Sequence, residues 1–352
     1  GKDKEEIKMQ KWTRVMYQPN LPLGENGEKV TASSKHITLS KEAAKEGMVL
    51  LKNDGDLLPL AKGSKVALFG KASFDYVRGG GGSGEVTVSY ARNLYEGLSL
   101  LKDKINVFEE LAAYYRDNVK AQYQQGRVPG MTVEPEVPME LLKKASAYTD
   151  TAIITICRFS GEGWDRKSIV DTENKNLCIT EDAMAKQSAE IFEDGDFCLT
   201  HAERAMVDTV TANFPKVIVV MNVGGMVDSC WFHDSAKIQS VLMAWQGGIE
   251  GGLATAELLI GEGNPSGKLV DTFARALTDY PSTDNFHASE RFVDYIEDIY
   301  VGYRYFETIP DADKKVNYPF GFGLSYTDFT LTAGAAYGQN NKIYVPVVVT
   351  NV

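Results

Sequence analysis

The sequence predicts an α/β fold: a layered α/β sandwich with a mostly parallel sheet, followed by a partial β-sandwich. Strand-like and helix-like segments alternate from about residue 65 to residue 260, which is the order of parallel βαβ units. Residues 151–157 are nearly all apolar and rich in β-branched side chains, as in a strand buried on both faces. Near the end of the chain, residues 330–333 and 342–350 alternate between apolar and polar side chains. Two strands alone cannot close a sandwich, so this second unit is expected to be incomplete.

Each element of the α/β region has a local signal. The expected strands are short apolar runs at residues 65–69, 105–108, 151–157, 216–221 and 240–244. The expected helices lie at residues 40–52, 93–101, 109–125, 139–148, 200–213 and 249–260. Ser40 is the expected N-cap of the first helix, and Thr200 with Glu203 fits the capping-box pattern. Parallel sheets place ligands at the carboxyl ends of their strands, so functional residues are expected at that edge.

The chain divides into four regions by composition. These are a polar lead-in at residues 1–37, the α/β sandwich domain at 38–275, an aromatic-rich connecting arm at 276–326, and the truncated β-sandwich at 327–352. Only the second region contains enough alternating elements to build a large core. The functional loop is therefore expected in the α/β sandwich domain.

The composition is that of an acidic globular protein. The 352 residues carry a formal net charge of −11, which disfavours nucleic acid and anionic membranes as partners. The longest apolar run, residues 217–227, is too short to span a bilayer, and the charged N-terminus lacks a signal-peptide core. A cytoplasmic location with free thiols is therefore expected. No cysteine or histidine pattern has metal-ligand spacing, so neither a metal nor another cofactor is expected.

One loop has a distinctive chemistry and follows the strand at residues 151–157 directly. Glycines on both sides of Glu162 remove bulk and permit unusual backbone angles, so this carboxylate is expected at a loop tip. Contact with Trp164 would raise its pKa, whereas Arg158 and Arg166 would lower it. A glutamate balanced between these influences suits proton transfer near neutral pH. Local chemistry leaves a second interpretation open, in which Glu162 is a solvated residue of a glycine turn.

A glycine-rich loop at residues 79–84 formally satisfies the pattern G-x-G-x-x-G. A dinucleotide site requires a strand directly before this pattern and a helix directly after it. Here the strand at 65–69 ends about ten residues earlier, and residues 85–90 are expected to be extended. The loop is therefore interpreted either as flexible or as a mobile lid over a pocket, with Asp75 and Arg78 beside it.

Six segments, taken together and in order, are similar to those of a known enzyme family. They lie at residues 49–53 with 57–60, 79–84, 160–166, 264–269 with 272–273, 301–305 and 319–326. On these segments the chain resembles the family 3 glycoside hydrolases, the β-glucosidase family. Six landmarks in the family's order are far more specific than any one of them.

The resemblance covers part of the family's architecture, which comprises a (β/α)8 barrel, an α/β sandwich and often a fibronectin-like domain. This chain is similar to the sandwich and to the opening strands of the fibronectin type III-like domain, and the barrel is missing. The lead-in at residues 1–37 looks more like the reversed order of some bacterial members, in which the barrel comes last. The resemblance therefore implies an N-terminal fragment of a longer enzyme, with the missing barrel as its partner.

By the same resemblance, Glu162 matches the family's general acid/base. Retaining glycosidases need two carboxyl groups about 5–5.5 Å apart, one as nucleophile and the other as acid/base. The family's nucleophile is an aspartate in a barrel motif that this chain lacks, and Asp279 and Asp294 do not match it. The resemblance implies part of a retaining β-glucosidase that is inactive as this chain alone.

Further residues near the acid/base are expected to border the pocket for an oligosaccharide or an aryl or alkyl glycoside. These candidates are Trp164, Phe159, Asp75 and Arg78. Asp165 and Arg166 are interpreted as a local ion pair that holds the loop.

Two functions of other classes remain as alternatives. The first is a non-catalytic carbohydrate-binding or scaffold module with the same fold, in which replacing Glu162 would leave the parent enzyme unchanged. The second is a nucleotide-binding α/β protein, whose melting temperature would respond to ATP or NAD.

Overall fold

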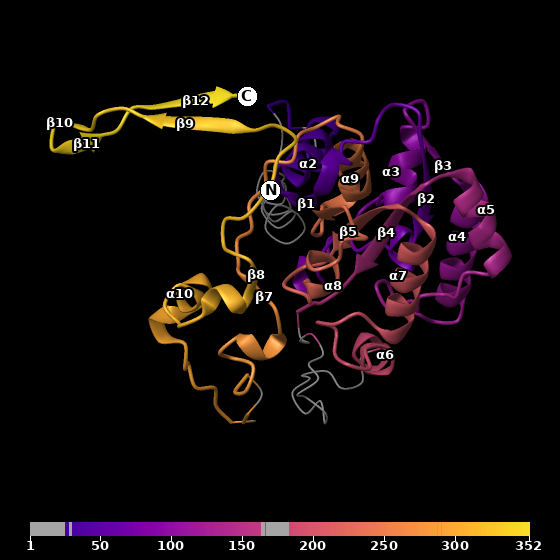
Figure 1. Ribbon diagram of the computed structural model, residues 1–352. Coiled ribbons are helices and arrows are strands. Elements are labelled where there is room, and N and C mark those ends of the chain that lie inside the picture. Colours follow the sequence, from indigo (N-terminus) through magenta and orange to yellow (C-terminus); the bar gives the residue numbers. More distant parts are fainter. Residues whose placement is uncertain (1–24, 28–29, 163–165, 167–182, 287, 290) are drawn as a thin grey trace, which may run out of the picture.

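The computed structural model describes residues 25–27, 30–162, 166, 183–286, 288–289 and 291–352 (Figure 1). A six-stranded sheet in the order β1-β6-β5-β4-β2-β3 forms its centre. The strands are β1 Val49–Asn53, β2 Ser64–Phe69, β3 Ile105–Val107, β4 Thr151–Cys157, β5 Lys216–Asn222 and β6 Ser240–Met243. Neighbouring strands run parallel except β1, which pairs with β6 in the antiparallel sense. The predicted α/β fold with a mostly parallel sheet is confirmed.

Helices cover both faces of this sheet, as Figure 1 shows. They are α2 Ser34–Gly47, α3 Leu94–Leu100, α4 Glu109–Gln124, α5 Met139–Tyr148, α6 Ala183–Ile191, α7 His201–Asn213, α8 Cys230–His233, α9 Gly251–Leu259 and α10 Tyr303–Phe306. Alternate residues of β4 contribute to two separate cores: Ile154 packs with α4, α5 and α7, whereas Ile153 packs with α3 and α9. All seven residues of β4 are buried, as expected for a central strand with helices on both sides.

The first predicted helix is wrong in its bounds. Helix α2 begins after the N-cap Ser33, not after Ser40, and ends at Gly47. Residues 49–53 form strand β1, and Val49 to Leu51 are at most 2% exposed. A short apolar run does not distinguish a helix from a buried strand, and pairing with β6 decides for the strand here. The expected boundary after residue 37 consequently falls inside α2.

The other predicted strands and helices of the α/β region lie within a few residues of their expected positions. The capping box of Thr200 and Glu203 is present at the start of α7. Helices α6 and α8 were not predicted, because both lie in stretches without a sustained helical pattern. Helices α3 and α9 approach closely at Gly97, where a Cβ atom would overlap the carbonyl oxygen of Gly252.

The connecting arm returns to the sheet at its β1 edge. Its strand β8 Val316–Tyr318 pairs with β7 Phe273–Ala274, which lies just before the arm. Further along, the Leu324 N–H donates to the Leu50 carbonyl at 2.8 Å, which adds a bridge to β1. The arm thereby covers an edge that would otherwise offer unpaired backbone groups.

The final segment projects from the body as an extended antiparallel ladder (Figure 1). Its strands are β9 Phe329–Ala333, β10 Tyr337–Gln339, β11 Lys342–Tyr344 and β12 Val347–Asn351. The single strand expected at residues 342–350 is interrupted at Pro346, which has no backbone N–H for a ladder. The strands are exposed throughout, which agrees with the expectation of an unclosed β-sandwich.

Candidate active site

Glu162 lies in a loop just beyond the carboxyl end of β4, where it meets the glycine-rich loop. An isolated parallel bridge joins Gly81 to Gly161. The Gly81 N–H donates to the Ser160 carbonyl at 3.2 Å, and the Glu162 N–H donates to the Gly81 carbonyl at 3.5 Å. The glycine-rich loop therefore continues the sheet edge with two backbone hydrogen bonds and faces the glutamate directly.

Glu162 is exposed, and the described hydrogen-bond partner of its carboxylate is Ser83. The Ser83 N–H donates to Glu162 Oε2 at 2.6 Å. Hydrogen bonding by the Ser83 side chain, and then by its backbone amide, lowers the pKa of Glu162 below its ordinary value. From the sequence, opposing influences were expected to keep the pKa of Glu162 suited to proton transfer near neutral pH. That expectation is wrong for this chain, because the Ser83 hydrogen bonds stabilise the exposed carboxylate as an anion. Trp164, which was expected to oppose this effect, lies outside the described residues.

Arg158 faces away from Glu162, contrary to expectation. Its guanidinium is buried and donates to both carboxylate oxygens of Glu203, at 2.8 and 2.7 Å. It also donates to the backbone carbonyls of Cys157, Asp196 and Cys198. A bidentate pair with these added bonds is a structural anchor, which ties the end of β4 to the start of α7.

Arg166 is likewise held by a partner other than the one predicted. Its Nε lies 3.0 Å from each carboxylate oxygen of Asp196, and Nη1 donates to the Met226 carbonyl at 2.6 Å. The expected pairing partner, Asp165, lies outside the described residues. The structural role given to Arg166 agrees with these contacts.

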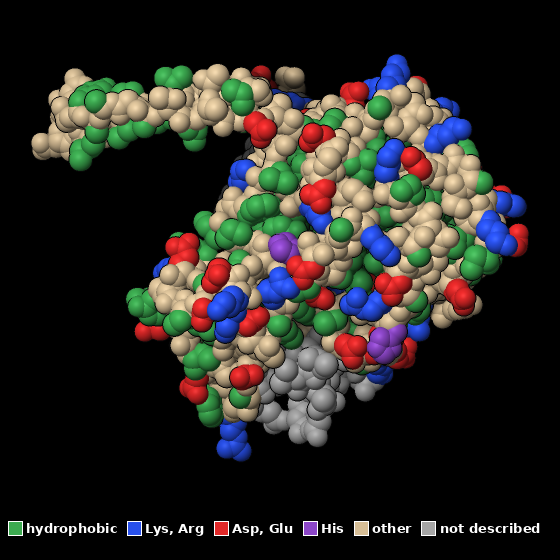
Figure 2. Space-filling model, in the orientation of Figure 1, with side chains coloured by type: hydrophobic (Ala, Val, Ile, Leu, Met, Phe, Trp, Pro, Cys, Tyr) green, Lys and Arg blue, Asp and Glu red, His purple; other side chains and the backbone are tan. Residues whose placement is uncertain are grey.

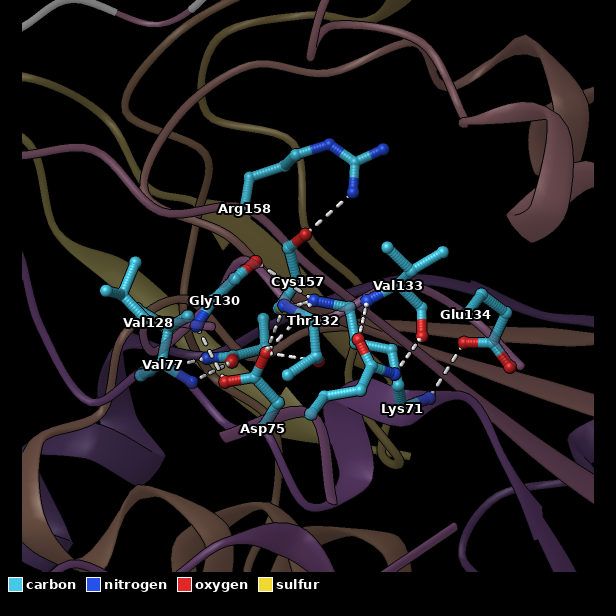
Figure 3. A network of polar contacts seen from close by, with 12 residues as sticks. Lys71, Asp75, Val77, Val128, Gly130, Thr132, Val133, Glu134, Cys157 and Arg158 are labelled. Atoms are coloured by element: carbon cyan, nitrogen blue, oxygen red, sulfur yellow. Dashed lines mark hydrogen bonds and ion pairs between the residues drawn. The ribbon is translucent and has the colours of Figure 1, made fainter. Parts of the chain in front are cut away.

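Asp75 is buried, and hydrogen bonds and an ion pair surround its carboxylate (Figure 3). Its carboxylate accepts from the Tyr123 hydroxyl, the Gly130 N–H, and the Thr132 N–H and hydroxyl, and pairs with Lys71 at 3.3 Å. Burial alone would raise its pKa, but the Lys71 charge and these hydrogen bonds outweigh it and lower the pKa. A direct sugar contact would require breaking this network, and the observed contacts of Asp75 hold the loop around Gly130. That Asp75 borders a sugar pocket stays a prediction.

Phe159 and Arg78 lie next to the glycine-rich loop. Phe159 is half-buried and packs against Val77 and Cys157, and a Cβ atom on Gly81 would lie 3.2 Å from its ring.

Arg78 is partly exposed, and its Nη2 donates to the Val86 carbonyl at 3.1 Å. The structure thus brings these two predicted residues to the edge that carries Glu162. That they border a sugar pocket stays a prediction.

Two residues that lie at this edge of the sheet, Ser83 and Asn222, were not singled out from the sequence. Ser83 was treated only as part of a glycine run, although it contacts Glu162. Asn222 ends strand β5 directly after five buried apolar residues. Its amide oxygen accepts from the Val77 N–H, and its amide nitrogen donates to the Val77 and Trp245 carbonyls. A polar residue at the end of an apolar strand was the available signal, since a buried amide needs such partners.

Glu134 is a second unusual carboxyl group, buried beside Lys71 (Figure 3). Its Oε2 accepts from the Lys71 N–H at 2.8 Å. Burial is the main cause that raises its pKa from 4.5 to about 7. Because the folded pKa lies above the unfolded one, the neutral form favours the native state. That contribution is complete below about pH 4.5 and is lost as the pH rises through about 7.

Glu134→Gln should remove this pH dependence, because glutamine does not titrate. Relative to the wild type, we expect the variant to gain about 3 kcal/mol of unfolding free energy between pH 4 and pH 8. Urea denaturation across that pH range measures the gain. Parallel stability curves for the two proteins would contradict the assignment.

The described residues carry no group of three or more histidine, cysteine, aspartate or glutamate side chains placed to hold a metal ion. Within the same residues, no helix is long and apolar enough to cross a membrane. Acidic and basic side chains are interspersed over the face shown in Figure 2. Cys157, Cys198 and Cys230 are free thiols.

The fold and this edge define an α/β domain that presents an exposed carboxylate beside the carboxyl end of a parallel strand. The sequence profile described as the glycosyl hydrolase family 3 C-terminal domain matches residues 48–326. This chain belongs to glycoside hydrolase family 3, as the resemblance implied. It is 63% identical over 323 residues to beta-glucosidase A of Butyrivibrio fibrisolvens, covering 92% of this chain and 39% of that protein.

Two solved structures have the same fold. A β-glucosidase from Paenibacillus barengoltzii matches with a TM-score of 0.75 and 37% identity, over 90% of this chain and 32% of that one. β-Glucosidase 3B of Thermotoga neapolitana, solved in complex with α-D-glucose, matches with a TM-score of 0.75 and 33% identity. That match covers 92% of this chain and 43% of the other. The chain thus spans less than half the length of these relatives.

Proposed function

We propose that this chain contributes the general acid/base, Glu162, to a retaining β-glucosidase. One observation carries the proposal: Glu162 is exposed at the carboxyl edge of the sheet, while the glycine-rich loop holds its carboxylate from one side. The names of the similar proteins support the substrate class, since all three described above are β-glucosidases more than 30% identical to this chain. The nucleophile would come from a barrel domain outside this chain.

The chemistry uses one carboxyl group twice. Protonated Glu162 donates its proton to the glycosidic oxygen while the nucleophile bonds to the anomeric carbon and the leaving group departs. Glu162, now a carboxylate, removes a proton from water as that water attacks the same carbon and frees the enzyme. The first step needs the acid form, which the lowered pKa of this chain disfavours. A second carboxylate about 5–5.5 Å away would raise the pKa by charge repulsion.

The substrate side of the site is proposed from the same edge. Phe159, Arg78 and Trp164 would border the pocket for an oligosaccharide or an aryl or alkyl β-glycoside. Asp75 would support it from below through the network around Gly130. A cytoplasmic location also stays a prediction from the sequence.

The proposal is tested by comparing this chain with the full-length protein on 4-nitrophenyl β-D-glucoside. We expect the full-length protein to release nitrophenol steadily and the purified chain to release none, because retaining hydrolysis needs both carboxyl groups. Turnover by the chain alone would refute the division of the two carboxyl groups between domains. An inactive full-length protein that still binds sugars would instead favour a carbohydrate-binding module.

A further inference from the structure

The glycine-rich loop touches the Glu162 loop at three successive residues. Gly81 makes the parallel bridge to Gly161, and Ser83 donates its N–H to Glu162 Oε2 at 2.6 Å. Between them, Gly82 lies directly against the glutamate side chain. These contacts join segments 79 residues apart in the sequence.

Gly82 has two reasons to be glycine. Its φ of +69° is a left-handed conformation that residues with a Cβ atom rarely adopt. A Cβ atom there would overlap the Cβ of Glu162, and it would lie 2.7 Å from Oε2 and 3.1 Å from Cα. The backbone of Glu162 would have to move to admit even an alanine.

We propose that Gly82 and Ser83 are positioning residues for the acid/base, and that they hold the Glu162 carboxylate at one place on the sheet edge. The glycine-rich loop then belongs to the catalytic apparatus and is neither a nucleotide cradle nor only a lid. This inference rests on the proposed function. It adds that the loop determines where the proton is delivered and how readily Glu162 gives it up.

Electrostatics around the carboxylate agree with this assignment. The contacts that lower the pKa of Glu162 come from the Ser83 side chain and backbone, with slight desolvation opposing them. The nearest charged groups of the loop, Arg78 and Glu85, lie 3.6 Å from each other and pair together. Losing the Ser83 contacts should therefore raise the pKa of Glu162, and the acid form should persist to higher pH.

The test is Gly82→Ala in the full-length protein, with Gly55→Ala as its matched control. Gly55 has a similar φ of +65°, but a Cβ atom there meets nothing within 4 Å. Both variants therefore carry the same kind of backbone strain, and only the first displaces Glu162. Kinetics on aryl β-glucosides of graded leaving-group ability, each over a full pH range, give the readout.

For Gly82→Ala we expect kcat/KM on poor leaving groups to fall on the order of 10²-fold, since a displacement near 1 Å costs about that much. For substrates with activated leaving groups, kcat/KM should fall far less. The basic limb of the pH profile should move to higher pH. Ser83→Ala should show the same upward movement to a smaller extent, because the backbone N–H remains. Gly55→Ala should keep the wild-type profile.

Three results would overturn the inference while leaving the proposed function standing. The first is a Gly82→Ala protein that behaves like Gly55→Ala. The second is an equal loss on every leaving group with an unmoved basic limb, which indicates general damage. The third applies if Gly82→Ala fails to fold: it is a Ser83→Ala protein whose pH profile has the same basic limb as the wild type. A wild-type protein without glycosidase activity would instead refute the proposed function, and this inference with it.

Discussion

Glu162→Gln in the full-length protein should slow hydrolysis of glucosides with poor leaving groups by about 10²–10⁴-fold, the usual range for a lost general acid. Glutamine has nearly the same shape and still accepts the Ser83 N–H, but it cannot donate or remove the proton. A leaving group such as 2,4-dinitrophenolate needs little protonation, so formation of the glycosyl-enzyme should then be slowed much less. A plot of log kcat/KM against leaving-group pKa should become steeper.

The second half of the reaction gives an independent check. Azide needs no general base, so it should accelerate breakdown of the glycosyl-enzyme in the variant and yield a glycosyl azide. Asp150→Asn is the matched control: it neutralises a partly exposed carboxylate just before β4, at the opposite end of the strand from Glu162. Glu162 would not be the acid/base if its glutamine variant slowed every substrate equally or matched Asp150→Asn.

Glu203→Gln should destabilise the fold by about 3–5 kcal/mol, because it removes the ion-pair partner of the buried Arg158 guanidinium. The side chains of Arg158 and Glu203 are 3% and 4% exposed, so water cannot replace the lost partner. The pair lowers the pKa of Glu203 despite its burial, which agrees with a stabilised anion. Glutamine retains one oxygen and the length needed for the capping contact at Thr200. Its amide nitrogen cannot accept from Arg158, so the substitution removes the charge and one hydrogen bond of the bidentate pair.

Urea denaturation of the chain measures this loss as a lower midpoint with an unchanged slope. Asp150→Asn again provides the comparison, since its pair with Lys216 has both side chains at least half exposed. Such surface pairs contribute about 0–1 kcal/mol, so its midpoint should barely move. Equal effects in the two variants would show that the Arg158–Glu203 pair adds no more than a surface ion pair.

Much of the fold could be predicted from the sequence because its signals are local. The apolar run of β4 indicates a strand buried on both faces, and the structure buries all seven of its residues. Thr200 and Glu203 form their capping box within one turn of α7. Glu162 follows a buried strand and lies between glycines, which correctly indicated an exposed loop near the carboxyl end. Each of these conclusions depends on residues only a few positions apart.

The tertiary structure alone decided the contacts that give these elements their roles. Residues 49–53 form a strand because they pair with β6, almost two hundred residues later. Arg158 turns from its neighbour Glu162 to Glu203, and Ser83 reaches Glu162 across 79 positions. Periodicity reports which face of an element is apolar, but it does not report which distant backbone lies opposite. The partners of a charged or polar group, and therefore its pKa, depend on how the chain packs in three dimensions.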